Sequence, residues 1–427
     1  MEISFTPSAD VALILNTLLD KLEQRAKRSP EDAPPALPKA PRPLKVALSD
    51  LPLPAYFSQT DPTPRLLTNE QLQVLERAGL LRLAWLPGER GHLLSAATLS
   101  PEHAPRLYEL LGRVPLGDVR ARLESLLLAE RFRFLPDDWR AAALRGVLGQ
   151  LRAGKSPSPF SLSDSGLNLD LLTLLAALPD LQSETPYRVF SVRVFNNSKR
   201  FDELKPALLR LARRANPQWK ALLAEELLRE LNLVANPGYL HLAGGWQLTT
   251  AGGEILSLGG FSPSVGFSAV QTPEVRAVEV YAGRVGPGAA AVLCIENLTT
   301  FHEFTRLQAG RYAVLCTMGN PSPSVRRVLR LIPEAIPLYL WADLDYGGFN
   351  ILSQLRRQVS RRIQPYRMGI ADFEAYAHLS RPLTRGDERH LKSLLQRSEL
   401  ADVGAVIEHL IRRGLKLEQE ALDCAQE

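Results

Sequence analysis

Three acidic side chains follow short apolar runs in the second half of the chain. Glu296 comes directly after the run AVLCI, and Asp343 and Asp345 close the run IPLYLWA. The two aspartates are two residues apart, so their side chains face the same way if the strand continues through them. Carboxylates held together repel one another, and a hard divalent cation such as Mg²⁺ or Mn²⁺ relieves this repulsion through oxygen ligands. The pattern therefore indicates metal-dependent chemistry on a phosphate ester.

The apolar runs themselves predict the elements that position these acids. AVLCI, YAVLCT and IPLYLWA are short and continuously hydrophobic, and each is followed by a helix-like segment. Such runs are typical of strands that are buried on both faces of a parallel sheet, so the order β-α-β-α-β is expected. Ligands of open sheets bind beyond the carboxyl ends of the strands. Glu296, Asp343 and Asp345 should therefore meet at one edge of the sheet.

Each acid has a predicted role in this chemistry. Asp343 and Asp345 are expected to hold the cation, which polarises a scissile phosphate and lowers the pKa of a bound water. Glu296 either completes the ligand set or acts as a general base, and the residues alone leave both roles open. Gly347 and Gly348 permit close backbone approach before the next helix, whose first amides could contact phosphate.

These residues resemble a known family. Glutamate at the end of one strand and Asp-x-Asp-x-Gly at the end of a later one form the Toprim signature of topoisomerases, primases and some nucleases. The segments IENLTTF, GNPS and ADLDYGGFNI, preceded by SVRVFNNSKRF and followed by KLEQEAL, are similar to the JetD family of Wadjet plasmid-defence systems. That family is itself similar to the A subunit of topoisomerase VI.

The resemblance implies a fold, an activity and partners. The fold would be an α/β Toprim domain with a Rossmann-like parallel sheet, in a multidomain α+β chain. The activity would be hydrolysis of double-stranded plasmid DNA by a metal-dependent endonuclease whose catalytic and metal-binding residues are Glu296, Asp343 and Asp345. The partners would be a second copy of the chain, an SMC ATPase, a kleisin and a small winged-helix subunit. Lys416, Glu418 and Glu420 match a pattern that closes the family's domain.

Two other functions remain open beside hydrolysis. A topoisomerase VI-like transesterase would need an attacking tyrosine, and Tyr187, Tyr239 and Tyr281 all lack the arginine-rich, aromatic context of such enzymes. A degenerate Toprim fold could instead serve as a DNA-bound scaffold without catalysis. Asp-x-Asp alone also occurs in phosphatases and glycosyltransferases, but the preceding strand that ends in Glu296 argues against them.

Basic residues supply the candidate DNA contacts, because guanidinium and ammonium groups pair with phosphate. Lys199 and Arg200 match the family's Ser-Lys step, and Arg326 and Arg327 lie on the helix predicted after Ser322. A solvated helix face is the alternative for each arginine taken singly. Taken together with the arginines of the following predicted helix, these residues form a basic cluster beside an acidic site. Such a cluster favours nucleic-acid binding over a merely solvated surface.

Four segments are predicted along the chain. Residues 1–115 combine a helix, a proline-rich insert over 29–43, a helix capped at Thr68-Asn69 and a hairpin, which is the winged-helix pattern. Residues 116–184 form a leucine-rich helical arm. Residues 185–270 form a second winged-helix domain, in which NPGYLHLAGGWQLTT is a candidate wing, and 271–427 form the Toprim domain, with a last amphipathic helix over VIEHLIRRGLKLEQEAL.

Composition excludes several classes of protein. The chain has 427 residues, 45% of them hydrophobic, and a formal net charge of +5, which permits nucleic-acid binding without requiring it. Its three cysteines give neither a disulfide framework nor zinc-ligand spacing. The first residues show no basic stretch before an apolar core and no run of 18 apolar residues occurs, so a cytoplasmic, DNA-associated protein without membrane contact is expected.

Overall fold

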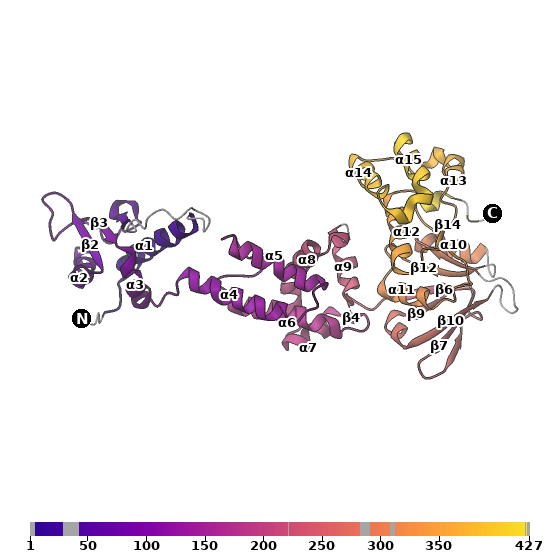
Figure 1. Cartoon of the computed structure of the whole chain (residues 1–427), viewed down its shortest axis with the longest axis horizontal. Helices are drawn as coiled ribbons and strands as arrows, with labels where there is room; N and C mark the ends of the chain where they lie inside the picture. The colour runs from indigo at the N-terminus through magenta and orange to yellow at the C-terminus, as the bar shows by residue number, and fades with distance from the viewer. Residues whose placement is uncertain are drawn as a thin grey trace. The chain divides into compact units, whose positions relative to one another are not determined.

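The computed structural model of the chain describes residues 5–28, 42–220, 222–281, 291–307, 312–422 and 424. The chain divides into two compact units, Met1–Ser165 and Gly166–Glu427, and Figure 1 labels many of their elements. This division falls within the helical arm that the sequence predicts over 116–184. Most of the predicted proline-rich loop, 29–41, lies outside the described residues. None of the described helices is long and apolar enough to cross a bilayer.

The first unit begins with a small α/β domain around one hydrophobic core. Its elements are α1 (Ala9–Arg28), β1 (Leu44–Ala47), α2 (Thr63–Arg77), β2 (Leu81–Trp85), β3 (Leu94–Leu99) and α3 (Ala104–Leu111). The strands form an antiparallel sheet in the order β1-β3-β2. The predicted hairpin of β2 and β3 is therefore present, and β1 pairs with the free edge of β3. The winged-helix assignment itself stays a prediction.

The predicted start of α2 at Thr68-Asn69 is wrong. The helix begins at Thr63, whose backbone N–H donates to Asp61 Oδ1 at 2.9 Å, and Thr68 and Asn69 are buried inside it. The Asn69 side chain binds tertiary partners instead of capping a helix. Its Oδ1 accepts from the Tyr56 hydroxyl at 2.9 Å and its amide donates to the His92 carbonyl at 2.9 Å.

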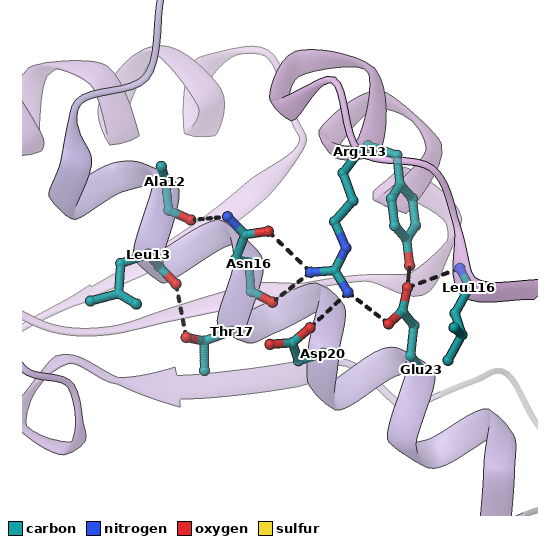
Figure 2. Close-up of polar contacts among 9 residues, drawn as sticks. Ala12, Leu13, Asn16, Thr17, Asp20, Glu23, Arg113 and Leu116 are labelled. Atoms are coloured by element: carbon teal, nitrogen blue, oxygen red, sulfur yellow. Dashed lines mark hydrogen bonds and ion pairs between the residues drawn. The ribbon is translucent and has the colours of Figure 1, made fainter. Parts of the chain in front are cut away.

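Arg113 ties α1 to the start of the helical arm (Figure 2). Its guanidinium donates to Asp20 Oδ1 at 2.7 Å and to Glu23 Oε2 at 2.6 Å. The other oxygen of Glu23 accepts from the backbone N–H of Leu116 at 3.1 Å, which satisfies a free amide in the first turn of the next helix. The arm in this unit consists of α4 (Leu116–Arg131) and α5 (Trp139–Arg152).

The second unit opens with four helices and two short parallel strands. These are α6 (Ser165–Ala177), β4 (Thr185–Pro186), α7 (Tyr187–Phe195), α8 (Arg200–Ala215), α9 (Ala224–Glu230) and β5 (Leu233–Val234), with a 3₁₀ turn η4 (Pro217–Lys220). Of these helices, α6 lies within the helical arm that the sequence predicts over 116–184.

The predicted wing over NPGYLHLAGGWQLTT is wrong, because its two strands join different sheets. β6 (Tyr239–Ala243) pairs with β12 (Ala313–Cys316), whereas β7 (Gly245–Thr250) pairs with β10 (Val275–Tyr281) and β8 (Ile255–Ser257). Gly244 makes the switch with φ of +84°, and a Cβ there would lie 2.5 Å from the Tyr312 carbonyl oxygen. A residue with a side chain does not fit this crossing.

The largest sheet has six strands in the order β14-β13-β11-β12-β6-β9. The predicted runs form β11 (Val292–Ile295), β12 and β13 (Leu338–Trp341), which pair in parallel, as does β14 (Gln364–Pro365). The connecting helices are α10 (Leu298–Leu307), α11 (Pro323–Arg330) and α12 (Tyr346–Gln358). The predicted β-α-β-α-β order is confirmed. Antiparallel β6 and β9 (Val265–Ser268) extend the sheet beyond it.

The end of the chain differs from the predicted long helix. Its elements are α13 (Ile370–Ala375), β15 (Arg381–Pro382), α14 (Arg385–Leu394), α15 (Gly404–Arg413), β16 (Leu415–Lys416) and the 3₁₀ turn η8 (Gln419–Ala421). α15 stops because Gly414 adopts φ of +65°, the left-handed conformation common just after a helix. The segment after Gly414 is therefore free to run back to the sheet.

Candidate functional site

Glu296 and Asp343 are neighbours at the carboxyl ends of two paired strands. Ile295 of β11 lies opposite Trp341 of β13, and the backbone N–H of Glu296 donates to the Trp341 carbonyl at 3.0 Å. Just beyond the last paired residues, the N–H of Asp343 donates to Glu296 Oε2 at 3.1 Å. The parallel pairing that the sequence predicts therefore brings these two acids together.

Asp345 stands at the start of α12 as its N-cap. Its Oδ1 accepts from the backbone N–H of Gly348 at 3.0 Å, which satisfies one of the free amides of the first turn. Gly348 is needed for this tight turn, since a Cβ there would lie 2.0 Å from the Asp343 carbonyl oxygen. The predicted close backbone approach is thus present at Gly348.

A segment near the end of the chain completes this acidic edge. Leu417 and Leu344 exchange backbone hydrogen bonds of 2.9 and 3.2 Å. The Gln419 backbone N–H then donates to Asp343 Oδ1 at 2.7 Å, and its side-chain amide donates to the Trp341 carbonyl at 2.8 Å. Gln419 is fully buried, so it holds the Asp343 carboxylate in one orientation.

The same segment brings further acids to the edge. Glu420 accepts a hydrogen bond from the Asn297 amide, beside Glu296. Lys416 lies on this segment too, and its ammonium is 3.2 Å from Asp387. Sequence reasoning matched Lys416, Glu418 and Glu420 to a family pattern without a physical role, and it missed Gln419. The structure shows that this pattern marks the segment that packs against the strand ends.

Burial and crowding raise the pKa of all three acids. Burial raises the pKa of Glu296 to about 8, with repulsion from Asp343 next in importance. Burial also raises the pKa of Asp343 to about 7, assisted by Asp345 and Glu420 and opposed by the hydrogen bond from Gln419. The pKa of Asp345 is raised by burial as well, while the amide of Gly348 opposes the shift. Each carboxylate therefore lies where a nearby cation would be stabilising.

The donor set suits a hard divalent cation, because it consists of carboxylate oxygens that destabilise one another when ionised. Each carboxylate of the set is turned toward a backbone amide: Glu296 to Asp343, Asp343 to Gln419, and Asp345 to Gly348. Within the described ranges, no three His, Cys, Asp or Glu side chains already converge as a metal-binding group. These amide bonds engage one oxygen of each carboxylate and leave the second oxygen for a cation, so binding would require the three side chains to move closer together while the amide bonds can persist.

The predicted DNA contacts Arg326 and Arg327 are engaged inside the protein. The guanidinium of Arg326 is buried and makes a two-pronged ion pair with Glu230, at 2.7 Å to each carboxylate oxygen. Arg327 donates to the backbone carbonyls of Thr272 and Pro273 at 2.9 and 3.1 Å. In this structure both arginines join α11 to neighbouring segments, and Arg326 is not exposed to a phosphate.

Lys199 and Arg200 lie at the start of α8. Lys199 is exposed, whereas Arg200 donates to Asp170 at 2.6 Å and to Glu203 at 2.5 Å. They lie on a different element from the three acids, and no printed contact joins them to the acidic edge. Their role in DNA binding stays a prediction.

Fold and site together define an α/β protein whose mixed sheet presents clustered carboxylates at the ends of its parallel strands. Residues 261–427 match the family described as Wadjet protein JetD, C-terminal. The chain is also 23% identical over 376 residues to Wadjet protein JetD of Bacillus cereus (strain Q1), which covers 86% of this chain and 88% of that protein. Both matches confirm the predicted resemblance to JetD, over residues 261–427 for the family model and over most of the chain for the relative.

Proposed function

We propose that this chain is a divalent-metal-dependent DNA endonuclease that acts in a Wadjet anti-plasmid defence system. The observation that carries the proposal is the direct contact of Glu296 with Asp343 at paired strand ends, with Asp345 two residues further on. Similarity to a Wadjet protein over most of the chain supports a role in that system. Identification of the sheet and its acids as a Toprim domain forms part of the proposal.

The chemistry follows from the positions of the acids. When Mg²⁺ or Mn²⁺ is bound, it polarises the scissile phosphodiester and makes a bound water more acidic. Asp343 and Asp345 are the proposed ligands, and Gln419 orients Asp343 through its backbone N–H. Glu296 has a pKa near 8 without a cation, which suits a group that exchanges a proton near neutral pH. It acts as a further ligand or as the general base.

Assembly is part of the proposal through the family. A homodimer would provide two acidic edges for the two strands of plasmid DNA. SMC and kleisin subunits would deliver the DNA, with a small winged-helix subunit as the remaining partner. A single copy would cut only one strand at a time.

One observation favours a second candidate, a DNA-bound scaffold without catalysis. The acids are turned toward backbone amides, and no ready metal-binding group exists among the described residues. No comparable observation favours transesterification. Tyr187 is packed 5.3 Å from the Phe201 ring and burial raises its pKa, and a hydrogen bond to Glu279 raises the pKa of Tyr281. Raised pKa values make both hydroxyls poorer nucleophiles.

A plasmid-cleavage assay tests the nuclease. The full chain is incubated with supercoiled plasmid and Mg²⁺ or Mn²⁺, with and without EDTA, alone and with the SMC–kleisin complex. Free linear product that EDTA abolishes is expected from the native chain and from the control Asp180→Asn, an exposed aspartate. Asp343→Asn should give no product. Protein attached to DNA ends would indicate a transesterase, and binding without cutting in any mixture would indicate the scaffold.

A further inference from the structure

One face of α12 leads away from the acidic edge. Tyr346 directly follows Asp345, and Asn350, Gln354 and Arg357 follow it at intervals of three or four residues. Side chains with this spacing lie along one side of a helix. The helix has 13 residues and is therefore about 20 Å long. This face thus connects the proposed cutting site with a region well beyond it.

The α12 face forms one wall of a cavity of about 150 Å³. The opposite wall comes from η4, including Trp219 and Lys220, and from Glu230 of α9. Arg397 also lines the cavity, and its guanidinium donates to Asn350 Oδ1 at 2.9 Å. Aromatic rings and cations thus share one small cavity that adjoins the acidic edge.

The cavity has a net positive lining. Lys220, Arg357 and Arg397 contribute cations, and the one carboxylate in the lining is Glu230. Both oxygens of that carboxylate are occupied by Arg326, so its charge is already neutralised. Lys220 and Arg357 are exposed and can meet an incoming phosphate; the Arg357 guanidinium also lies 4.0 Å from Glu399 Oε1, a carboxylate outside the lining. Because the Arg326–Glu230 ion pair cancels the negative charge of Glu230, the remaining cations of the lining can attract an anion.

The polar groups of the lining fit a base as well as a phosphate. The side-chain amides of Asn350, Gln354 and Gln358 belong to residues that line the cavity. A phosphodiester offers only acceptors at neutral pH, whereas bases carry both donors and acceptors on their edges, with which amide side chains pair. Trp219 adds an aromatic surface of the kind on which unpaired bases stack.

The cationic surface continues past the cavity. Lys220 also lines a more open hollow of about 590 Å³ beside α8, together with Arg210, Arg213 and Arg214. A nucleic-acid strand that entered the cavity would thus meet further arginines in the direction away from α12. Consecutive phosphates are the ligand that such a row of cations fits.

We propose that this cavity binds one unstacked nucleotide of a DNA strand, adjacent to the phosphodiester presented at the acidic edge. Lys220 and Arg357 hold its phosphate, Trp219 stacks on its base, and the amide side chains of the lining hydrogen-bond the base edge. The inference rests on the proposed function in taking DNA as the ligand. It implies a preference for DNA that is locally unpaired or distorted, where the cost of unstacking is lowest.

Binding without cutting tests this proposal. The full chain in EDTA is titrated into a short fluorescein-labelled single-stranded oligonucleotide, an abasic oligonucleotide of equal length, and the intact duplex, and anisotropy is recorded. The native chain should bind the base-bearing strand about fivefold or more tightly than the abasic strand. Trp219→Ala should remove this difference, and Arg357→Ala should weaken binding to both strands. Arg361→Ala, an exposed arginine outside the cavity, should match the native chain.

Equal affinity of the native chain for the base-bearing and abasic strands would overturn the nucleotide site, as would base discrimination that survives in Trp219→Ala. Should Trp219→Ala fail to fold, as judged by thermal unfolding, Trp219→Leu removes the aromatic ring with a smaller loss of volume and should also reduce the discrimination. The two assays distinguish failure of the proposed nuclease function from failure of the proposed nucleotide site. Base-dependent binding without plasmid cutting refutes the endonuclease alone, and cutting without base-dependent binding refutes the cavity alone.

Discussion

Replacing Glu296 with glutamine is expected to stabilise the metal-free chain at pH 8. The glutamine keeps a side-chain oxygen that can accept from the Asp343 N–H, a bond of 3.1 Å in the native chain. It removes one negative charge from the acidic edge. The substitution therefore tests the electrostatic cost of the cluster with little change in its shape.

The sign of the effect follows from the raised pKa of Glu296. Burial, with repulsion from Asp343 next, lifts this pKa from 4.5 to about 8, so the folded chain holds the proton more tightly than the unfolded chain. The resulting stabilisation is full below pH 4.5 and is lost as pH rises from there to about 8. At 1.36 kcal/mol for each pH unit, the loss is at most about 5 kcal/mol. The pKa of Asp343 is raised to about 7, so part of this loss of stability comes from the ionisation of Asp343.

The assay is the free energy of unfolding of the unit that holds Glu296, measured with urea in EDTA between pH 5 and pH 9. The native chain should lose stability over this range, and Glu296→Gln should lose less. Glu303→Gln, an exposed glutamate on α10, serves as the matched control and should follow the native chain. Added Mg²⁺ should stabilise the native chain more at pH 8 than at pH 5, because more carboxylate is ionised there.

Parallel pH dependence of the native chain and Glu296→Gln would refute this reasoning. It would mean that the Glu296 carboxylate ionises with an ordinary pKa in the folded chain. An equal effect of Glu303→Gln would point instead to a general effect of net charge.

Three further predictions concern neighbouring residues. Asp343→Asn and Asp345→Asn each keep a side-chain oxygen that accepts from a backbone N–H but lose the negative charge, so each should abolish metal-dependent cutting with little change in thermal unfolding; native cutting by either would reject the site. Gly348→Ala puts a Cβ 2.0 Å from the Asp343 carbonyl oxygen and should cost about 1–3 kcal/mol in urea unfolding; a neutral result would contradict the tight turn. Arg326→Met should lower the free energy of unfolding by about 3 kcal/mol, because it leaves the Glu230 carboxylate unpaired, and adding Glu230→Gln should restore part of that loss. No loss of stability in Arg326→Met would contradict a stabilising role of the ion pair.

Local sequence pattern was sufficient for the centre of the sheet. The runs before Glu296 and Asp343 became β11 and β13, because a short, continuously apolar segment is stable only when both faces are covered. The pattern failed for the predicted wing. The same residue types occur in a hairpin turn and in a chain segment that passes from one sheet to another. Only the close packing of Gly244 against the Tyr312 carbonyl shows that the second arrangement is formed here.

The role of each charged residue depended on partners that are distant in sequence. Arg326 looked like a phosphate ligand on a basic helix, yet Glu230, 96 residues earlier, takes its guanidinium. Gln419 carried no signal of its own, and its backbone N–H reaches Asp343 across 76 residues. Burial of these pairs depends on the complete fold, so the sequence did not show them.

The sequence by itself determined which acids stand at strand ends, since that follows from hydrophobic runs and from the direction of parallel strands. Tertiary structure alone decided that the segment from Leu415 to Ala421 returns to the strand ends and orients Asp343. It also decided that a neutralised Glu230 lines a cationic cavity beside α12. The physical reason is that burial and charge compensation act between surfaces, and folding brings those surfaces together from remote parts of the chain.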